Sequence, residues 1–580
     1  MRPATHRIRL PRRLLRPPNA HYPEPPCPRQ FSHKPPRLLL ITNRSTPRPQ
    51  LPFLYPTGQY LSNGQIFRLF SISANHKKFI KETARQTVKY TVLIWIVTTC
   101  FSLASFGILS ERQERAFPSP HEWSLITRIR FRRGKWWQVP ENNEDEGFPN
   151  WARVYSELQS AMNRLENPTK DGAGLVEQEE GGLMVPGVGK AGYDLTAKSE
   201  EWRQGYYEVL LGMARAAERL EGWVTDKWRR NVWAPEFVAS PTNPRPKATL
   251  PGMPPVPEED QRVPAAEAPE TFYLKIITSK GFTTNQRLTA ALGYADWLAF
   301  RKLPDSAEEM YRWALDIAIS GLPIPDPSTT INRTSGVLSS TAPKEHITPN
   351  LVYAATNLAT FHAEQGNIIA ALPILISLLR ARLTADPAPP PPPAEEPDSS
   401  LTGTLLSLLN EPDYPPLPPT GDEPLLRREE DRCEEAALKS YIGEILFATA
   451  GSSPSQRQQG LSWVRDAVST AKIAQSLAPI ANDDERRKKC EQCEEVGLES
   501  WGKIMTYLAA EAHEKRDAAK SRSLHGLMWK LWGTQKLDED VQNLEGEEEG
   551  VTMRLNKLRG KMLKEEYEDM DRKYARTFVF

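Results

Sequence analysis

The chain has 580 residues, too many for a single hydrophobic core, so we expect several folded units joined by linkers. Its formal net charge is only +1, but residues 1–75 carry 12 Lys and Arg against a single acid, Glu24, and the rest of the chain is net acidic. Because the basic part is a leader and not a folded face, the charge argues against nucleic acid as a partner.

The leader, residues 1–75, is rich in Arg, Ser and Pro and contains no long apolar run. This composition is typical of a mitochondrial presequence and not of a secretory signal. Arg68-Leu69-Phe70-Ser71 resembles a matrix-processing pattern, but Arg29-Gln30-Phe31-Ser32 fits it too, so the cleavage position stays open. A disordered basic tail is the alternative.

The stretch 91–109, within a unit at 76–110, contains no charged residue. As a helix it would be about 28 Å long, which is near the thickness of a bilayer core. A buried core helix is the alternative. Five Lys and Arg precede the stretch closely and two follow it. The positive-inside rule therefore predicts a single-pass inner-membrane protein with its amino terminus in the matrix and residues 110–580 in the intermembrane space.

The juxtamembrane segment 111–150 holds a basic cluster, Arg128 to Lys135, followed by Trp136 and Trp137. Basic and aromatic residues suit a membrane interface, so this cluster could lie on the lipid surface.

Residues 151–233 predict a helical unit, because WARVYSELQSAMNRLE and EEWRQGYYEVLLGMARAAERLEGW both have apolar residues at helical spacing. The loop GGLMVPGVGKAG between them is not a phosphate-binding loop, since Met184 and Ala191 stand where Gly and Ser or Thr are needed. Residues 234–270 contain ten prolines and predict a linker.

The pattern of residues 271–535 predicts helix pairs like those of tetratricopeptide repeats. In this large-and-small pattern, a large apolar residue is followed by a small one on the first helix, and small or aromatic residues on the second helix let the two helices approach closely. A fourth, degenerate repeat would start at Trp501-Gly502. A generic helical bundle is the alternative. The three better matches use the following residues: Tyr294, Ala295, Ala307, Tyr311 and Ala314; Leu358, Ala359, Gly366, Ala371, Leu375 and Leu378; Ile442, Gly443, Gly460, Val464 and Ala467.

A proline-rich insertion at 385–425 interrupts these pairs and should be extended, apart from a short apolar helix near Leu401–Leu409. The charged tail, 536–580, predicts a solvated helix. The fold class is thus all-α: one transmembrane helix followed by an α-solenoid of degenerate helix pairs.

The chain shows no motif of an enzyme, a metal site or a cofactor site, so we expect a non-catalytic protein without cofactor. Cys490 and Cys493 are closely spaced, but no second ligand pair follows, which favours incidental cysteines on a helix over zinc ligands. His362 is expected to be a packed histidine and not a catalytic base.

The order of parts is distinctive: a leader, a single span, ERQERAFPSPHEW, EWRQGYYEVLLGMARAAERLEGW, degenerate repeats, and YPPLPPTGDEP within an insertion. This order resembles the fungal tetratricopeptide-repeat adaptor subunit of the mitochondrial inner-membrane i-AAA protease supercomplex. The resemblance implies an adaptor that binds unfolded membrane or intermembrane-space proteins and delivers them to the protease. Its implied partners are the i-AAA protease, the other adaptor subunit and the lipid bilayer.

In tetratricopeptide repeats the first helix of each pair lines the binding groove, and carrying that register over gives nine candidate residues. An acid at Asp296 would repel a terminal carboxylate, so we expect apolar, unfolded segments as ligands. Alternatively, the aromatic candidates pack against a neighbouring helix. The candidates are Leu292, Asp296, Phe300, Tyr353, Thr356, Glu364, Ser440, Glu444 and Phe447.

Two other functions remain open. A membrane-anchored repeat scaffold could serve protein import or complex assembly at another membrane, and in a secretory lumen Asn332-Arg333-Thr334 would accept a glycan. An enzyme with an unrecognised site is the other possibility.

Overall fold

A computed structural model describes residues 73–577 of the chain, with internal gaps. The predicted leader, 1–75, and the apolar helix near Leu401–Leu409 lie outside the described residues, except for 73–75. The gaps are 144–147, 178–183, 186–188, 191, 229–230, 250–251, 253, 324–325, 390–413, 452, 478–479, 481–482 and 523–528.

Helix α2 (Ala74–Ala116) contains the whole uncharged stretch 91–109. It is the one helix in the described part of the chain that is long and apolar enough to cross a membrane by length and composition. Its apolar side chains, such as Trp95 and Phe101, are exposed. The Thr98 hydroxyl donates to the carbonyl oxygen of Ile94 at 2.8 Å, so this polar group is satisfied within the helix.

The end of α2 packs on α3 (Leu125–Gln138) through a buried ion cluster. The Glu114 carboxylate pairs with Arg132 and, at 3.3 Å, with Arg128. It also accepts hydrogen bonds from the backbone and hydroxyl of Ser119 at 3.1 and 2.8 Å. Burial of a charge is tolerated only when the charge is paired and hydrogen-bonded in this way.

The basic cluster that could lie on the lipid surface therefore forms ion pairs within the protein. Beyond the two arginines at Glu114, Arg130 pairs with Glu157 at 2.6 Å and Lys135 pairs with Glu208 at 2.7 Å. These ion pairs link α3 to α4 (Trp151–Leu165) and α5 (Glu200–Arg219), and contact of the cluster with lipid stays a prediction.

Helices α4, α5 and α6 (Pro269–Thr278) form the first helical layer after α3. Their buried faces meet through Leu158, Tyr206, Met213 and Phe272. Two short antiparallel pairs lie between α4 and α5 in sequence: β1 (Val176–Glu177) with β4 (Tyr193–Asp194), and β2 (Met184–Val185) with β3 (Gly189–Lys190).

Residues 234–270, for which we expected a linker, attach to this layer through a small sheet. Its order is β6 (Val232–Trp233), β5 (Val224–Asp226) and β7 (Arg262–Pro264), all antiparallel, with Thr225 opposite Val263. Strands of two or three residues are too short to leave a periodic pattern, so no pattern along the chain indicated them.

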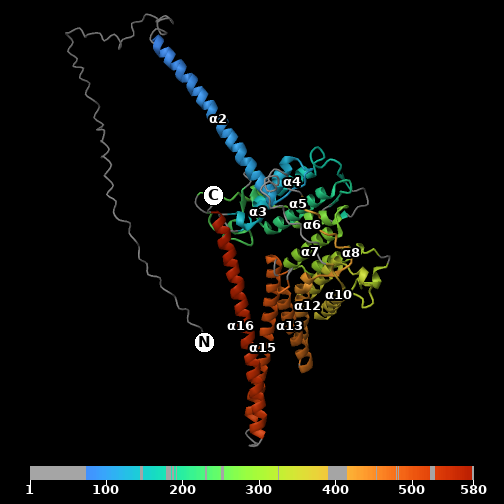
Figure 1. Cartoon of the computed structure of the whole chain (residues 1–580). Coiled ribbons are helices and arrows are strands. Elements are labelled where there is room, and N and C mark those ends of the chain that lie inside the picture. Colours follow the sequence, from blue (N-terminus) through green and yellow to red (C-terminus); the bar gives the residue numbers. More distant parts are fainter. Residues whose placement is uncertain are drawn as a thin grey trace, which may run out of the picture. The chain divides into compact units, whose positions relative to one another are not determined.

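From α6 onward the chain forms successive antiparallel helix pairs, as Figure 1 shows. This arrangement confirms the predicted all-α solenoid. The pairs are α7 (Thr284–Phe300) with α8 (Pro304–Ser320), α9 (Pro349–Glu364) with α10 (Ile368–Thr384), α12 (Arg432–Thr449) with α13 (Pro454–Gln475), and α15 (Asp484–Arg522) with α16 (Trp529–Thr577).

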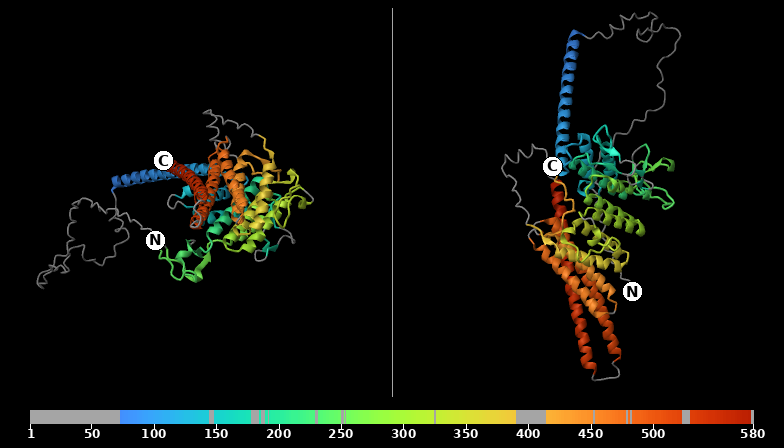
Figure 2. Two further views of the ribbon diagram at one scale, coloured as in Figure 1. Left: turned by 90° about the horizontal axis from the view of Figure 1, so that it is seen from below. Right: turned by 90° about the vertical axis from the view of Figure 1, so that its right-hand side faces the viewer.

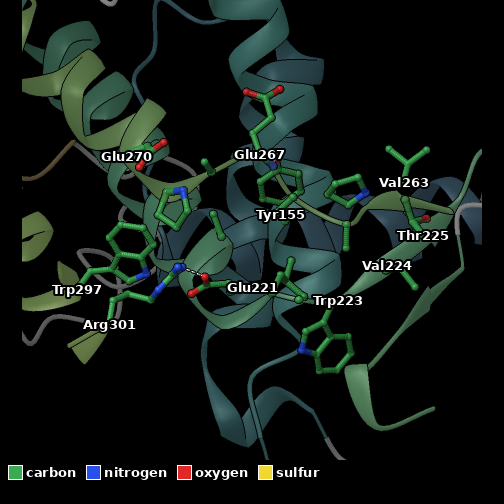
Figure 3. Close-up of a pocket in the computed structure, with 18 of the residues that line it drawn as sticks. Tyr155, Glu221, Trp223, Val224, Thr225, Val263, Glu267, Glu270, Trp297 and Arg301 are labelled. Carbon is green, nitrogen blue, oxygen red and sulfur yellow. Dashed lines mark hydrogen bonds and ion pairs between the residues drawn. The ribbon is translucent and has the colours of Figure 1, made fainter. Parts of the chain in front are cut away.

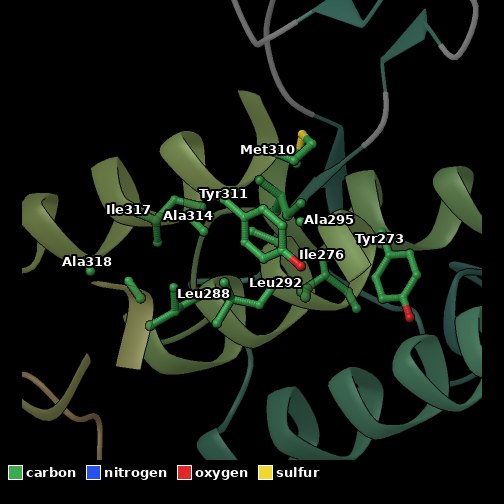
Figure 4. Close-up of a cluster of buried hydrophobic side chains, with 14 of the residues drawn as sticks. Tyr273, Ile276, Leu288, Leu292, Ala295, Met310, Tyr311, Ala314, Ile317 and Ala318 are labelled. Carbon is green, nitrogen blue, oxygen red and sulfur yellow. The ribbon is translucent and has the colours of Figure 1, made fainter. Parts of the chain in front are cut away.

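The large-and-small pattern packs as the repeat prediction requires. Leu292 and Ala295 of α7 meet Tyr311 and Ala314 of α8 in the buried cluster drawn in Figure 4. The small residues let the two helices approach, and Tyr311 fills the space toward Phe361 of α9, with ring centroids 4.8 Å apart. His362 is buried, as expected, and burial lowers its pKa.

Helices α12 and α13 approach each other closely at two glycines. A Cβ atom added to Gly443 would come within 2.8 Å of the Gly460 carbonyl oxygen, and one added to Gly460 within 2.7 Å of the Phe447 backbone nitrogen. Only glycine fits at such a distance. Both glycines belong to the third predicted repeat.

A disulfide joins Cys433 of α12 to Cys490 of α15, with the two Cα atoms 5.2 Å apart. The prediction of incidental cysteines was therefore wrong for Cys490, because its partner lies 57 residues away in sequence and on another helix. Cys493 is free and half-buried, and burial raises its pKa.

The charged tail does not stand alone. It belongs to α16, which runs back along α15, and the two views of Figure 2 show the helices side by side.

Between α10 and α12, residues 414–425 pack against the start of α9 and the residues before it. Asn350 Nδ2 donates to the Thr420 carbonyl oxygen at 2.9 Å, and Leu425 N donates to the Ile347 carbonyl oxygen at 2.7 Å. β8 (Asp386–Pro387) and β9 (Leu426–Arg427) pair in parallel at the ends of this insertion.

Candidate functional site

The nine residues predicted to line a groove do not share one surface. Leu292 is 2% exposed and Ser440 is 4% exposed, so both belong to the interior and cannot line a groove. The transferred register was wrong for these two. On α12 the outward-facing aromatic residue is Tyr441, one position after Ser440, and an alignment by short repeat motifs cannot resolve a shift of one residue.

The two phenylalanines also differ from each other. Phe300, at the end of α7, is 82% exposed. Phe447 is half-buried, with its ring edge-on to Tyr507 of α15 at a centroid distance of 5.7 Å. It packs against a cluster that includes Leu461 and Met505. Phe447 therefore follows the alternative stated above, in which the aromatic side chain packs against a neighbouring helix.

The exposed side chains of α5, α7, α9 and α12 form a surface that we call the first-helix face. The charges of Asp296 and Arg215 act on the Tyr353 phenol, and those of Glu364 and Glu444 act on Tyr441, so successive helices bring these groups together. The face is defined by Arg215, Asp296, Tyr353, Glu364, Tyr441 and Glu444, all of which are exposed.

Local contacts fix the polar members of this face. The Tyr311 hydroxyl donates to Oδ1 of Asp296, and Ser500 of α15 donates to Glu444 at 3.3 Å. Thr356, another predicted groove residue, is half-buried, and its hydroxyl donates a hydrogen bond to the Val352 carbonyl oxygen at 2.7 Å. Thr356 therefore offers its neighbours less hydrogen-bonding capacity than Asp296 or Glu444 does.

Partial burial shifts the ionisation of the face. Burial raises the pKa of Tyr353, the charge of Asp296 raises it further, and Arg215 opposes both. Burial also raises the pKa of Asp296, while the hydrogen bond from Tyr311 lowers it. Three acids against one arginine leave the face acidic, which disfavours a carboxylate ligand and favours a neutral or cationic one.

A cavity of about 960 Å³ lies beside the small sheet, where the end of α5, the start of α6 and the end of α7 meet (Figure 3). Trp223, Val263 and Trp297 give it apolar walls. Arg301 and Glu221 form an ion pair at its edge, and the Arg301 guanidinium lies over the Trp297 ring, 5.3 Å from its centroid. Neither this cavity nor Tyr441 was found from sequence, because each depends on which residues meet in space.

The polar groups of the cavity are sparse. The Tyr155 hydroxyl accepts a hydrogen bond from the Glu267 backbone N–H at 3.0 Å. The Trp297 indole N–H is buried and has no hydrogen-bond partner among the residues that the structure describes. Within that same part of the chain, no group of three or more His, Cys, Asp or Glu side chains could hold a metal ion.

Comparison with known proteins adds little to this geometry. No family model matches the chain, and no curated protein matches it. Among solved structures, a de novo designed helical repeat protein is similar, at 12% sequence identity, over 48% of this chain and 98% of its own. The TM-score of 0.17 is too low for this likeness to carry any conclusion.

Proposed function

We propose that this protein is a non-catalytic adaptor of the mitochondrial inner membrane that binds unfolded proteins on its first-helix face and delivers them to the i-AAA protease. In this role α2 anchors the chain, and the helix pairs present bound segments on the intermembrane-space side. The protease chemistry belongs to the partner.

The observation that carries this proposal is the pair of exposed tyrosines, Tyr353 and Tyr441, on the first helices of successive pairs, α9 and α12. Exposed aromatic rings bury apolar side chains at low entropic cost, because only two side-chain torsions must be fixed. Their acidic neighbours exclude a chaperone-type carboxylate tail. An extended apolar segment without a terminal carboxylate suits such a face best.

The disulfide supports the proposed orientation. Disulfides persist in oxidising compartments and are rare where thiols are kept reduced, as in the cytosol. Cys433 and Cys490 both lie after α2, so the bond favours an oxidising compartment for residues 110–580. The resemblance to the inner-membrane adaptor favours the intermembrane space over a secretory lumen.

Two measurements test compartment and topology together. Rapid acid quenching followed by thiol alkylation should show Cys433 and Cys490 protected and Cys493 modified in the full chain. Protease added after rupture of the outer membrane should remove the soluble domain, whereas intact mitochondria should protect it. Reduced Cys433, digestion in intact mitochondria, or a glycan on Asn332 would refute this placement.

The adaptor role is tested by replacing Tyr353→Ala together with Tyr441→Ala in the full chain. We expect substrates of the i-AAA protease to live longer, while the level of the adaptor itself is unchanged. The matched control is Ile369→Ala with Ile473→Ala, which removes two exposed apolar side chains from the second helices α10 and α13. Equal substrate half-lives in the two variants would refute the role.

A further inference from the structure

We propose that the cavity beside the small sheet is a second binding site, which takes an apolar side chain of an extended segment whose neighbouring residue is Lys or Arg. This inference rests on the proposed function and gives it a sequence preference. The preference arises from three features of the cavity: its apolar walls, an orphan donor and unpaired carboxylates.

The walls accept an apolar side chain. Trp223, Val263 and Trp297 line a volume of about 960 Å³, which is in the range of cavities that hold small ligands. Ala266 and Ala268 line it as well and leave room because their side chains are single methyl groups. Apolar area removed from water here would supply the main part of the binding free energy.

The buried indole N–H of Trp297 is a donor for a backbone carbonyl oxygen of a bound segment. Trp297 is 9% exposed, and its indole N–H lies on the side of the ring that faces Arg301 and Glu221 (Figure 3). A buried donor without a partner in the described chain carries a desolvation cost. Because the N–H is buried, a carbonyl oxygen of a bound segment would reach it and remove that cost only after a shift of the Arg301 side chain, which lies over the same ring.

The carboxylates of Glu267 and Glu270 favour a basic residue in the ligand, next to the apolar side chain that enters the cavity. Glu267 and Glu270 both line the cavity, and neither forms an ion pair with a residue of the described chain. Arg301 at the opposite edge is already paired with Glu221. Glu267 is exposed and Glu270 is half-buried, so the rim of the cavity carries two negative charges without an ion pair. These charges would attract a Lys or Arg beside the buried side chain and repel Asp or Glu.

A stacked row of rings connects this cavity with the first-helix face. Trp297 stacks on Tyr294 with centroids 5.9 Å apart, and Tyr294 stacks on Tyr273 at 6.0 Å. The Tyr273 hydroxyl donates to Glu218 at 2.7 Å, and the charges of Asp296 and Arg215 both act on Tyr273. These largely buried rings therefore link the wall of the cavity to side chains beneath the face through the interior of the protein.

The experiment measures binding of three unstructured, fluorescently labelled peptides to the purified full chain. One peptide carries Leu and Trp flanked by Lys, the second has Asp in place of each Lys, and the third has only Gly and Ser. We expect the Lys-flanked peptide to bind more tightly than the Asp-flanked one. The double variant Glu267→Gln, Glu270→Gln should bind the Lys-flanked peptide about fivefold more weakly, as expected for the loss of two partly solvated ion pairs.

The control pair Glu258→Gln with Glu259→Gln removes the same charge from exposed residues of the preceding turn, which do not line the cavity, and should leave binding unchanged. A third variant, Ala268→Trp, fills the cavity from its exposed rim and should abolish binding there without removing charge. Equal losses in the two glutamate pairs, or unchanged binding in Ala268→Trp, would overturn the inference.

Crosslinking separates this inference from the proposed function. A photo-crosslinker at position 353 reports on the first-helix face with the same peptides. If crosslinking there persists while the cavity variants have no effect, the cavity is not a site and the adaptor proposal stands. If no peptide binds at either place, both fail.

Discussion

The pair α7–α8 and the pair α15–α16 are both antiparallel helix pairs, but different forces hold them. In the first, Leu292, Tyr311 and their neighbours form a continuous apolar interior. In the second, a narrow apolar seam that includes Leu498 and Val551 is flanked by ion pairs. These join Arg559 to Glu495 at 2.7 Å, Lys561 to Glu491 at 2.7 Å, and Lys488 to Asp569 at 2.5 Å.

This difference explains why the first pair was recognised from sequence, whereas the second was indicated only by a degenerate repeat start at Trp501-Gly502 on α15. An apolar pair leaves a large-and-small pattern that repeats along the chain. A pair stabilised by charges looks like a solvated helix, because each Lys or Glu is as frequent on a free surface as in an ion pair. The comparison predicts different responses of the two pairs to substitution and salt.

The largest expected effect is the loss of an apolar side chain from the first pair. Leu292→Ala should cost about 2–5 kcal/mol of unfolding free energy, because it leaves a cavity in a closely packed interior. The matched change on the second pair, Leu563→Ala, removes an exposed side chain and should cost less than about 0.5 kcal/mol. Urea unfolding of the full chain measures both, and equal costs would contradict the comparison.

The disulfide ties the two kinds of structure together, since it joins α12 of an apolar pair to α15 of the charged pair. Cys433→Ser should lower stability by about 2–4 kcal/mol. Cys493→Ser, which changes a free thiol beside the same cluster, is the control and should have a small effect. Equal melting temperatures for wild type and Cys433→Ser would show that the bond does not constrain the fold.

Glycine substitutions test how closely the helices approach. Gly443→Ala should destabilise the chain by about 1–3 kcal/mol, because the new Cβ would collide with the backbone of α13. Gly546→Ala on α16 meets no atom within 4 Å and should stabilise its helix by about 1 kcal/mol. Thermal unfolding should therefore show shifts of opposite sign, and a destabilising Gly546→Ala would contradict this account.

The smallest effect concerns single ion pairs of the second pair. Lys488→Ala should cost about 0.2–1 kcal/mol, because the contact with Asp569 is partly solvated. Hydrogen exchange along α15 and α16 should quicken at about 1 M salt, where charges are screened beyond a few ångströms, while exchange in α7 and α8 should not. Equal salt responses would mean that the apolar seam alone holds the second pair.

Much of the fold followed from local pattern. The uncharged stretch of α2 and the small residues of the first three repeats lie where periodicity placed them. The strands β5–β7, the Cys433–Cys490 bond and the α16 packing did not follow, because each depends on residues distant in sequence. On the first-helix face, the repeat register named the exposed residues Asp296, Tyr353, Glu364 and Glu444, whose role in binding stays a prediction. It named Ser440 where the neighbouring Tyr441 faces outward, because a repeat register cannot be fixed to one residue without the packing.

Site-specific photo-crosslinking can show directly whether the first-helix face binds unfolded proteins. A photoreactive amino acid is placed at Tyr353 on the first-helix face, or at Ile369 on α10, which is 90% exposed on a second helix. With the full chain in its native membrane, we expect crosslinks to unfolded proteins from position 353 and few from position 369. Equal yields at the two positions, or crosslinks only to folded proteins, would contradict the claim that this face binds unfolded substrates.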